Sequence, residues 1–227
     1  MYYQNVNGLK TKLDEFSANI ILNSHEIICL TETNLNDEIN SQELFVNNNY
    51  VVYRSDRNLG ESQKKSGGGV LCAIASEIES FRRYDLNSQG ESVWIQCKIG
   101  KEILIVCTVY FPPKSRYIDY EYFSKYMENT INSLDPNAHV IIVGDFNLPS
   151  IEWENEENIS VPITWSGAQA EEILLVTAAN DFSQFNTTRN HNGKILDLIF
   201  SNKDTITVDK CDDPVVPEDK HHPSLLF

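Results

Sequence analysis

Basic residues are scarce in this sequence, and that scarcity limits the partners that its composition favours. The 227 residues include 18 lysines and arginines against 33 aspartates and glutamates, which gives a net charge of −15 at pH 7. A nucleic-acid binder usually carries a basic face that neutralises phosphates, so the overall charge favours other partners. Nucleic acid is not excluded, because a few cations can line one cleft while acidic residues cover the remaining surface.

Long apolar runs and a leader segment are also lacking. No stretch of about 18 uncharged apolar residues is present to span a bilayer, so we expect no membrane partner. The opening residues, MYYQNVNGLK, lack the basic and apolar parts of a secretory signal. We therefore expect the protein in the reducing interior of a cell.

Cysteine is too sparse and too widely spaced for a disulfide framework or a structural zinc site. The five cysteines are odd in number and form no CxxC pair and no Cys/His spacing typical of zinc ligands. Most of them lie in apolar runs such as IICL and LIVCTVY, which predicts buried free thiols.

What the sequence does contain is a regular alternation of apolar strands and amphipathic helices. Leu13, Phe16 and Ile20 recur at helical spacing, and a second helix is expected around residues 168–179. Buried strands are predicted at HEIICL, GGGVLCAIAS, SVWIQCKIG, KEILIVCTVYF, HVIIVGDFN and KILDLIF. No repeat or linker marks a boundary, so we expect one α/β or α+β sandwich domain over residues 1–227.

Polar groups end or interrupt four apolar segments, namely YYQNVNG, IICLTETN, IVGDFN and ILDLIF. Any one of them reads most simply as a turn or a helix cap. Together with the closing residues EDKHHPSLLF, they contain the side chains that a metal-dependent phosphoesterase needs. Carboxylate and amide oxygens suit Mg²⁺, and a further carboxylate or imidazole can orient or deprotonate the attacking water.

In order and spacing, these motifs resemble the endonuclease/exonuclease/phosphatase (DNase I-like) superfamily over essentially the whole chain. GDFNLPSIEW, the TTRN segment before KILDLIFSN, and the EDKHHPSLLF ending look most like the apurinic/apyrimidinic-type endonuclease domain of LINE-type non-LTR retrotransposons. The resemblance implies a four-layer sandwich, in which two mixed β-sheets pack face to face and helices flank them. It also implies an active site at one edge of the sheets.

The resemblance further implies a role for each motif residue. Glu32, with Asn5 beside it, would bind the divalent metal, Mg²⁺ or alternatively Mn²⁺. Asp145 would orient or deprotonate the water, Asn147 would hold that water or the scissile phosphate, and Tyr110 would hydrogen-bond the phosphate.

The two terminal histidines leave the alignment open. Asp197 corresponds to an aspartate near the leaving group, and one histidine would contact the phosphate or act as an acid or base. If His221 takes that position, the family's preceding aspartate is replaced by Lys220. We expect His222 instead, with Asp219 supplying the carboxylate three residues earlier.

Simpler interpretations remain for several of these residues. Asn7 reads as the start of a turn rather than a metal ligand, and Tyr110 could serve core packing. His25 and His139 each precede a strand and are expected at the surface or in caps. His191 lies in a polar loop that is equally compatible with DNA contact and with no contact.

Cations for a DNA path are expected in loops and at strand ends. The candidates are Lys64, Lys65, Lys114, Arg116 and Arg189. Lys114 and Arg116 follow Tyr110 closely, and Arg189 precedes Asp197 across a short hairpin. We expect Lys114 and Arg189 to flank the double-stranded DNA.

The function expected from the resemblance is Mg²⁺-dependent nicking of target DNA to leave a 3′-hydroxyl. That end would prime a reverse transcriptase encoded downstream in a longer polyprotein, and the protein would act in the nucleus. Only four residues precede Asn5, which favours an excised domain or a degraded copy. Two alternatives are a related phosphoesterase acting on a phosphoinositide, lipid headgroup or RNA, and an inactive relic that binds DNA or protein.

Overall fold

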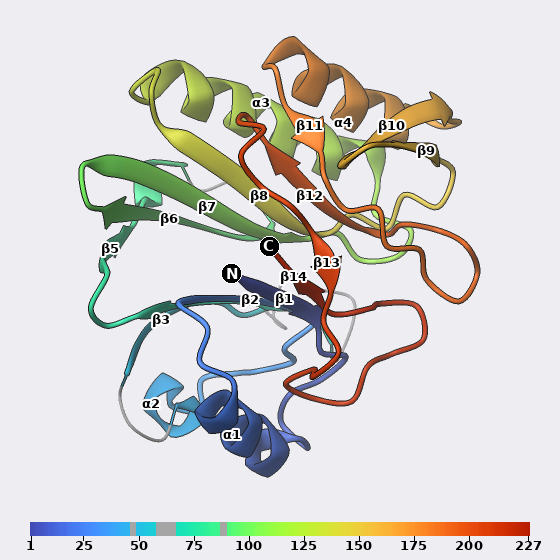
Figure 1. The fold of residues 1–227 in the computed structure, drawn as a ribbon. Helices are drawn as coiled ribbons and strands as arrows, with labels where there is room; N and C mark the ends of the chain where they lie inside the picture. The colour runs from blue at the N-terminus through green and yellow to red at the C-terminus, as the bar shows by residue number, and fades with distance from the viewer. Residues whose placement is uncertain (46–48, 58–66, 87–89) are drawn as a thin grey trace.

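Two mixed β-sheets packed face to face form the centre of the molecule, and helices cover both outer faces (Figure 1). The computed structural model describes residues 1–45, 49–57, 67–86 and 90–227. The predicted sandwich is therefore confirmed, and its layers follow from burial of the apolar sheet faces against each other and against amphipathic helices.

The smaller sheet has six strands in the order β13, β14, β1, β2, β4 and β3. In chain order they are β1 Tyr2–Asn5, β2 Ile27–Thr31, β3 Tyr50–Ser55, β4 Val70–Ala75, β13 Asp209–Lys210 and β14 Leu225–Leu226. β1 and β2 are parallel, whereas the C-terminal β14 pairs antiparallel to β1. The last residues of the chain thus lie beside the first.

The larger sheet has eight strands in the order β5, β6, β7, β8, β12, β11, β10 and β9. Their bounds are β5 Glu79–Arg82, β6 Glu91–Ile99, β7 Glu102–Tyr110, β8 His139–Asp145, β9 Glu152–Glu156, β10 Ile159–Thr164, β11 Ser183–Gln184 and β12 Asp197–Ser201. β7 and β8 are parallel, and β12 runs antiparallel to β8.

The helices form the outer layers. α3 (Tyr117–Ser133) and α4 (Ala168–Ala179) cover the larger sheet, while α1 (Leu13–Leu22) and α2 (Ser41–Leu44) cover the smaller one (Figure 1). A 3₁₀ turn spans Tyr84–Leu86. Among the residues that the structure describes, no helix is long and apolar enough to cross a membrane.

Three apolar clusters fill the spaces between these layers. The central cluster lies between the sheets and includes Tyr3, Cys29, Cys72 and Val143. The other two pack the larger sheet against α3 and α4, and the smaller sheet against α1 and α2. All five cysteines are buried free thiols, as their apolar surroundings in the sequence predicted.

Close packing of β7 against β8 requires a glycine at position 144. A Cβ built on Gly144 would lie 1.8 Å from the carbonyl oxygen of Val109, a backbone atom that cannot move aside cheaply. Because Gly144 immediately precedes Asp145 in β8, this contact also sets the position at which the strand enters the site.

We expect Gly144→Ala to lower the free energy of unfolding by about 3 kcal/mol, because the added methyl group must push β7 and β8 apart. Urea unfolding of the variant and the wild type would measure the difference. A loss smaller than about 0.5 kcal/mol, the range of ordinary surface substitutions, would contradict this account.

Candidate active site

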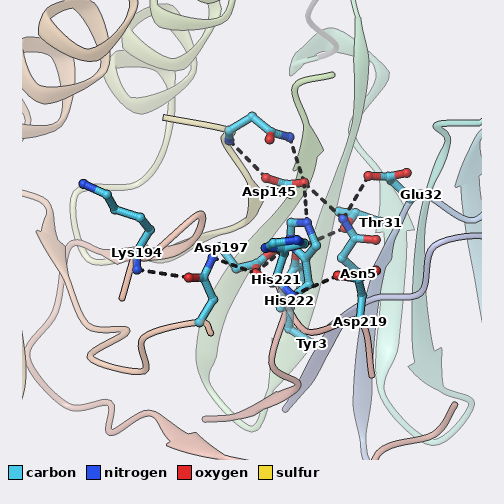
Figure 2. A network of polar contacts seen from close by, with 12 residues as sticks. Tyr3, Asn5, Thr31, Glu32, Asp145, Lys194, Asp197, Asp219, His221 and His222 are labelled. Carbon is cyan, nitrogen blue, oxygen red and sulfur yellow. Dashed lines mark hydrogen bonds and ion pairs between the residues drawn. The ribbon is translucent and has the colours of Figure 1, made fainter. Parts of the chain in front are cut away.

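Strand register brings the polar ends of five segments to one edge of the two sheets. In the smaller sheet, Asn5 pairs with Thr31 at the carboxyl ends of the parallel strands β1 and β2. In the larger sheet, Tyr110 pairs with Asp145, and Asp145 pairs on its other side with Asp197. The segment before β14 returns His222 to the same edge (Figure 2).

Asp145 lies at the centre of this edge and is fully buried. Its Oδ1 accepts a hydrogen bond from the backbone N–H of Asn147 at 3.0 Å. Its Oδ2 accepts from Asn147 Nδ2 at 2.9 Å and from Asn5 Nδ2 at 3.0 Å. Asn147 reaches both oxygens because its backbone turns back with a φ of 49°, which asparagine tolerates better than most residues.

Glu32, the residue that directly follows β2, lies across from Asp145. Asn5 joins the two carboxylates, because its Nδ2 also donates to Glu32 Oε1 at 3.1 Å. The Asn5 oxygen instead accepts from the backbone N–H of Asn7 at 3.0 Å. Asn5 therefore orients both carboxylates through its NH₂ group, and its sequence-based role as a metal ligand stays a prediction.

His222 lies between the carboxylates of the larger sheet. Its Nδ1 is 2.9 Å from Asp197 Oδ2 and 3.2 Å from Asp197 Oδ1, while its Nε2 is 3.8 Å from Asp145 Oδ2. Burial alone would lower the pKa of His222, but the carboxylates of Asp197, Asp145 and Glu32 outweigh it and raise the pKa to about 10. At neutral pH the ring is therefore a cation among three carboxylates.

These carboxylates also change the proton affinity of Asp145. Burial raises its pKa well above the usual value, and the charges of Asp197 and Glu32 raise it further. His222 and the hydrogen bond from the Asn147 N–H act in the opposite direction. A carboxylate with a raised pKa is better able to accept a proton from water than an ordinary surface aspartate.

Comparison with known proteins identifies the family to which the chain belongs. Residues 104–224, more than half of the chain, match the family described as endonuclease-reverse transcriptase. The chain belongs to this family. A comparison with curated proteins finds no match.

The fold of the chain is similar to those of several solved nucleases. The endonuclease domain of TRAS1, a telomere-specific non-LTR retrotransposon, is 12% identical with a TM-score of 0.68, covering 99% of this chain and 95% of that one. An AP endonuclease from Archaeoglobus fulgidus is 15% identical with a TM-score of 0.64, covering 100% and 99%. The APE2 catalytic domain of Xenopus laevis is 17% identical with a TM-score of 0.65, covering 100% and 91%.

The structure corrects one sequence-based pairing. Asp219 makes no hydrogen bond to the His222 ring: its Oδ1 accepts from the His221 backbone N–H at 2.8 Å, and its carbonyl accepts from the His222 N–H at 3.0 Å. Asp219 thus shapes the turn that carries His222, and the carboxylate beside the imidazole is Asp197. Three residues of sequence separation suit a turn contact better than a side-chain pair here.

His221 points away from the carboxylate cluster. Its Nδ1 lies 3.4 Å from Asn192 Nδ2, and its carbonyl accepts from Asn190 Nδ2 at 3.1 Å. The adjacent histidines therefore separate into two environments: His222 joins the carboxylates and His221 packs on the loop before β12. Which histidine takes part in catalysis stays a prediction, and the geometry favours His222.

Tyr110 borders the cluster on the side of Glu32. Burial raises the pKa of Tyr110 well above its usual value, and the nearby carboxylates of Glu32 and Asp145 raise it further, so the phenol keeps its proton. Arg57 lies over the Tyr110 ring with its Cζ 5.8 Å from the ring centroid, and its Nε donates to Glu91 at 2.6 Å. Sequence reasoning missed Arg57, because no motif marks its place beside Tyr110.

Sequence reasoning also missed Tyr3 and Thr31, which contribute to the site from the smaller sheet. The Tyr3 hydroxyl donates to Asp197 Oδ1 at 2.6 Å and lies 3.0 Å from Thr31 Oγ1. Tyr3 is two residues from Asn5, so it occupies the same side of β1. The alternation of side chains along a strand is the one sequence signal that could have indicated Tyr3.

The predicted DNA-contacting cations differ in their surroundings. Lys114 is exposed and shares the lining of a cavity of about 170 Å³ with Asn147. Arg116 is also exposed but pairs with Asp119 at 3.0 Å, and Arg189 donates to the carbonyls of Gly193 and Trp153. Lys64 and Lys65 lie outside the residues that the structure describes.

The donor set fits a divalent cation. Within the described part of the chain, one group of metal-ligating side chains was found: Glu32, Asp145 and His222, whose ligand atoms lie within 4.8 Å of one another. Because Mg²⁺ prefers oxygen ligands, the carboxylate oxygens of Glu32 and Asp145 are the members of this group that suit it. One or two carboxylates with room for water are typical of Mg²⁺ sites and also accept Mn²⁺.

The raised pKa of His222 predicts a pH-dependent contribution to stability in metal-free buffer. Because the folded value of about 10 exceeds the unfolded value of about 6.5, the contribution is complete below pH 6.5 and is lost as the pH rises toward 10. The difference in unfolding free energy between wild type and His222→Gln should therefore shrink over this range.

Urea unfolding with EDTA at a series of pH values would measure that difference, with His221→Gln as the control for losing a neighbouring imidazole. A difference that stays constant or grows with pH would contradict the predicted ion pairing of His222.

Proposed function

We propose that this chain is a Mg²⁺-dependent DNA endonuclease that nicks one strand by phosphodiester hydrolysis. The observation that carries the proposal is the meeting of Asp145, Glu32 and the imidazolium of His222 at one sheet edge. Membership of the endonuclease-reverse transcriptase family supports it. In this hydrolysis, water attacks the phosphorus atom and the bond between phosphorus and the 3′ oxygen breaks. The products are a 3′-hydroxyl and a 5′-phosphate.

Each side chain has a part in this reaction that follows from its surroundings. Glu32, with Asn5 beside it, would hold Mg²⁺, which neutralises phosphate charge and lowers the pKa of bound water. Asp145 accepts the proton of the attacking water, and its raised pKa suits that role. Asn147 keeps the Asp145 carboxylate in one orientation through two hydrogen bonds.

Two further groups stabilise charge on the phosphate. His222 carries a positive charge at neutral pH and is aimed into the site by Asp197, so it favours the more negative transition state. Tyr110 keeps its proton and can donate a hydrogen bond to a phosphate oxygen. In this proposal Asp197 acts through the imidazole rather than on the leaving group directly.

Double-stranded DNA is the proposed substrate, despite the overall negative charge. The TRAS1 domain and the AP endonucleases with which the chain shares its fold support a nucleic-acid substrate. We further propose that the nick's 3′-hydroxyl primes a reverse transcriptase encoded downstream in a longer polyprotein, and that the reaction takes place in the nucleus. Lys114, beside Asn147, would contact the DNA backbone.

Nicking of supercoiled plasmid in Mg²⁺ tests the proposed function. We expect Glu32→Ala, Asp145→Ala and His222→Ala each to lower the rate by at least about 100-fold, the usual effect of losing a group that acts in the transition state. His221→Ala is the matched control and should retain activity, because its ring lies outside the carboxylate cluster.

Glu102→Gln is a second control, since this exposed carboxylate occupies the opposite end of β7 from Tyr110. Wild-type rates in both Glu32→Ala and Asp145→Ala would rule out the assigned site. Absence of nicking by the wild type, with hydrolysis of a phosphoinositide or an RNA end, would favour the alternative substrate class. Absence of any hydrolysis would favour a binding relic.

Lys114 provides a separate test of the DNA path. We expect Lys114→Glu to weaken DNA binding and to lower the slope of log affinity against log salt by about one, as loss of a phosphate contact does. Lys125→Glu is the control, because Lys125 is exposed on α3 and pairs with Glu121. Fluorescence anisotropy at several salt concentrations, with Ca²⁺ in place of Mg²⁺, would measure both. Equal salt slopes for Lys114→Glu and the wild type would exclude the contact.

A further inference from the structure

A buried row of side chains connects the smaller sheet to the proposed catalytic imidazole in the larger one. It runs from Thr31 through the Tyr3 hydroxyl to Asp197, and from Asp197 to His222 (Figure 2). Tyr3 and Thr31 are completely buried, and Asp197 is 3% exposed. Solvent therefore has little access to this row, and the protein itself must supply the hydrogen bonds that orient the Asp197 carboxylate.

The Asp197 carboxylate has two donors in the structure, one from each direction. Its Oδ1 accepts from the Tyr3 hydroxyl at 2.6 Å, and both of its oxygens lie within 3.2 Å of His222 Nδ1. The backbone of Asp197 is held separately, by Asn186 Nδ2 on its carbonyl at 2.6 Å. Without Tyr3, the imidazole of His222 would be the remaining group that restrains the plane of the Asp197 carboxylate. The carboxylate could then no longer fix the orientation of that imidazole independently.

Tyr3 is itself fixed by its surroundings. Its ring lies in the apolar cluster between the sheets, and its strand pairs with β2 on one side and β14 on the other. Thr31 Oγ1, 3.0 Å from the hydroxyl, selects the direction in which the phenol points. A rigid hydrogen-bond donor of this kind can hold a side chain of the larger sheet in a fixed position relative to the smaller sheet.

We propose that Tyr3 is a positioning residue, which holds the Asp197 carboxylate in the orientation that places the His222 imidazole against Asp145. This inference rests on the proposed function for its kinetic consequence, and on the hydrogen bonds alone for its structural one. Tyr3 touches neither the phosphate nor the metal in this scheme. It acts through Asp197, so its loss should reduce turnover rather than substrate binding.

The neighbouring residue provides a matched control for the experiment. Tyr2 is also fully buried in β1, but its side chain lies in the cluster under α1. Its hydroxyl donates to Gln4 Oε1 at 2.7 Å and accepts from the Val215 N–H at 3.0 Å. Tyr2→Phe and Tyr3→Phe thus each remove one phenolic hydroxyl from β1, and the two hydroxyls lie on opposite faces of the strand.

For Tyr3→Phe we expect kcat for plasmid nicking to fall about tenfold, which corresponds to one lost hydrogen bond to a charged group, with KM within about twofold of the wild type. Tyr2→Phe should keep kcat, although urea unfolding should show destabilisation of both variants. Thr31→Val is a second variant, and we expect a smaller fall in kcat in the same direction. Equal kcat for Tyr3→Phe and Tyr2→Phe would overturn the proposal.

A double substitution separates positioning from a general structural effect. If Tyr3 acts through Asp197, adding Tyr3→Phe to Asp197→Asn should change the residual kcat by less than about twofold, because coupled residues are not additive. A further tenfold loss in the double variant would show that Tyr3 acts by another route, and would contradict the proposal.

An NMR measurement tests the same contact without any activity. In metal-free protein labelled with ¹⁵N-histidine, the His222 Nδ1–H signal can be assigned by its loss in His222→Ala. We expect Tyr3→Phe to shift this signal and Tyr2→Phe to leave it unchanged. An unshifted signal in Tyr3→Phe would refute the positioning role, whereas a shifted signal in a protein that nicks no DNA would refute the proposed function alone.

Discussion

The structure of the site depends on one electrostatic constraint, which is the pairing of Asp145 with Asp197 on adjacent strands. The register of β8 and β12 places these two buried carboxylates directly opposite each other. Like charges in this position repel, and burial increases the repulsion because little water screens it. The imidazolium of His222, within 4 Å of both, offsets that charge and explains why the chain brings a histidine to this edge.

The sandwich architecture makes this arrangement possible because the cluster draws on both sheets. Asn5, Thr31 and Glu32 come from the smaller sheet or its edge, while Asp145 and Asp197 come from the larger one. Packing of the two apolar faces therefore sets the distance between the proposed metal-binding and water-activating groups. The packing of the central core therefore determines both the stability of the molecule and the geometry of the site, as the tight contact at Gly144 illustrates.

Much of this could be predicted from local patterns. The apolar run of HVIIVGDFN predicted a buried strand ending in polar residues, and β8 ends at Asp145. Residues 168–179 were expected to be helical, and α4 covers that range. The hairpin of β9 and β10 has no strong apolar alternation and was not anticipated.

The sequence by itself determined which strands end in polar side chains, because periodicity and motif order are local properties of the chain. Only the tertiary structure decided which of those side chains meet. Proximity in sequence favoured Asp219 as the partner of His222, but the partner is Asp197, 25 residues away. Tyr3, 194 residues from Asp197, carries no motif. Contacts of this kind arise from strand register and from the packing of two sheets, which no local pattern encodes.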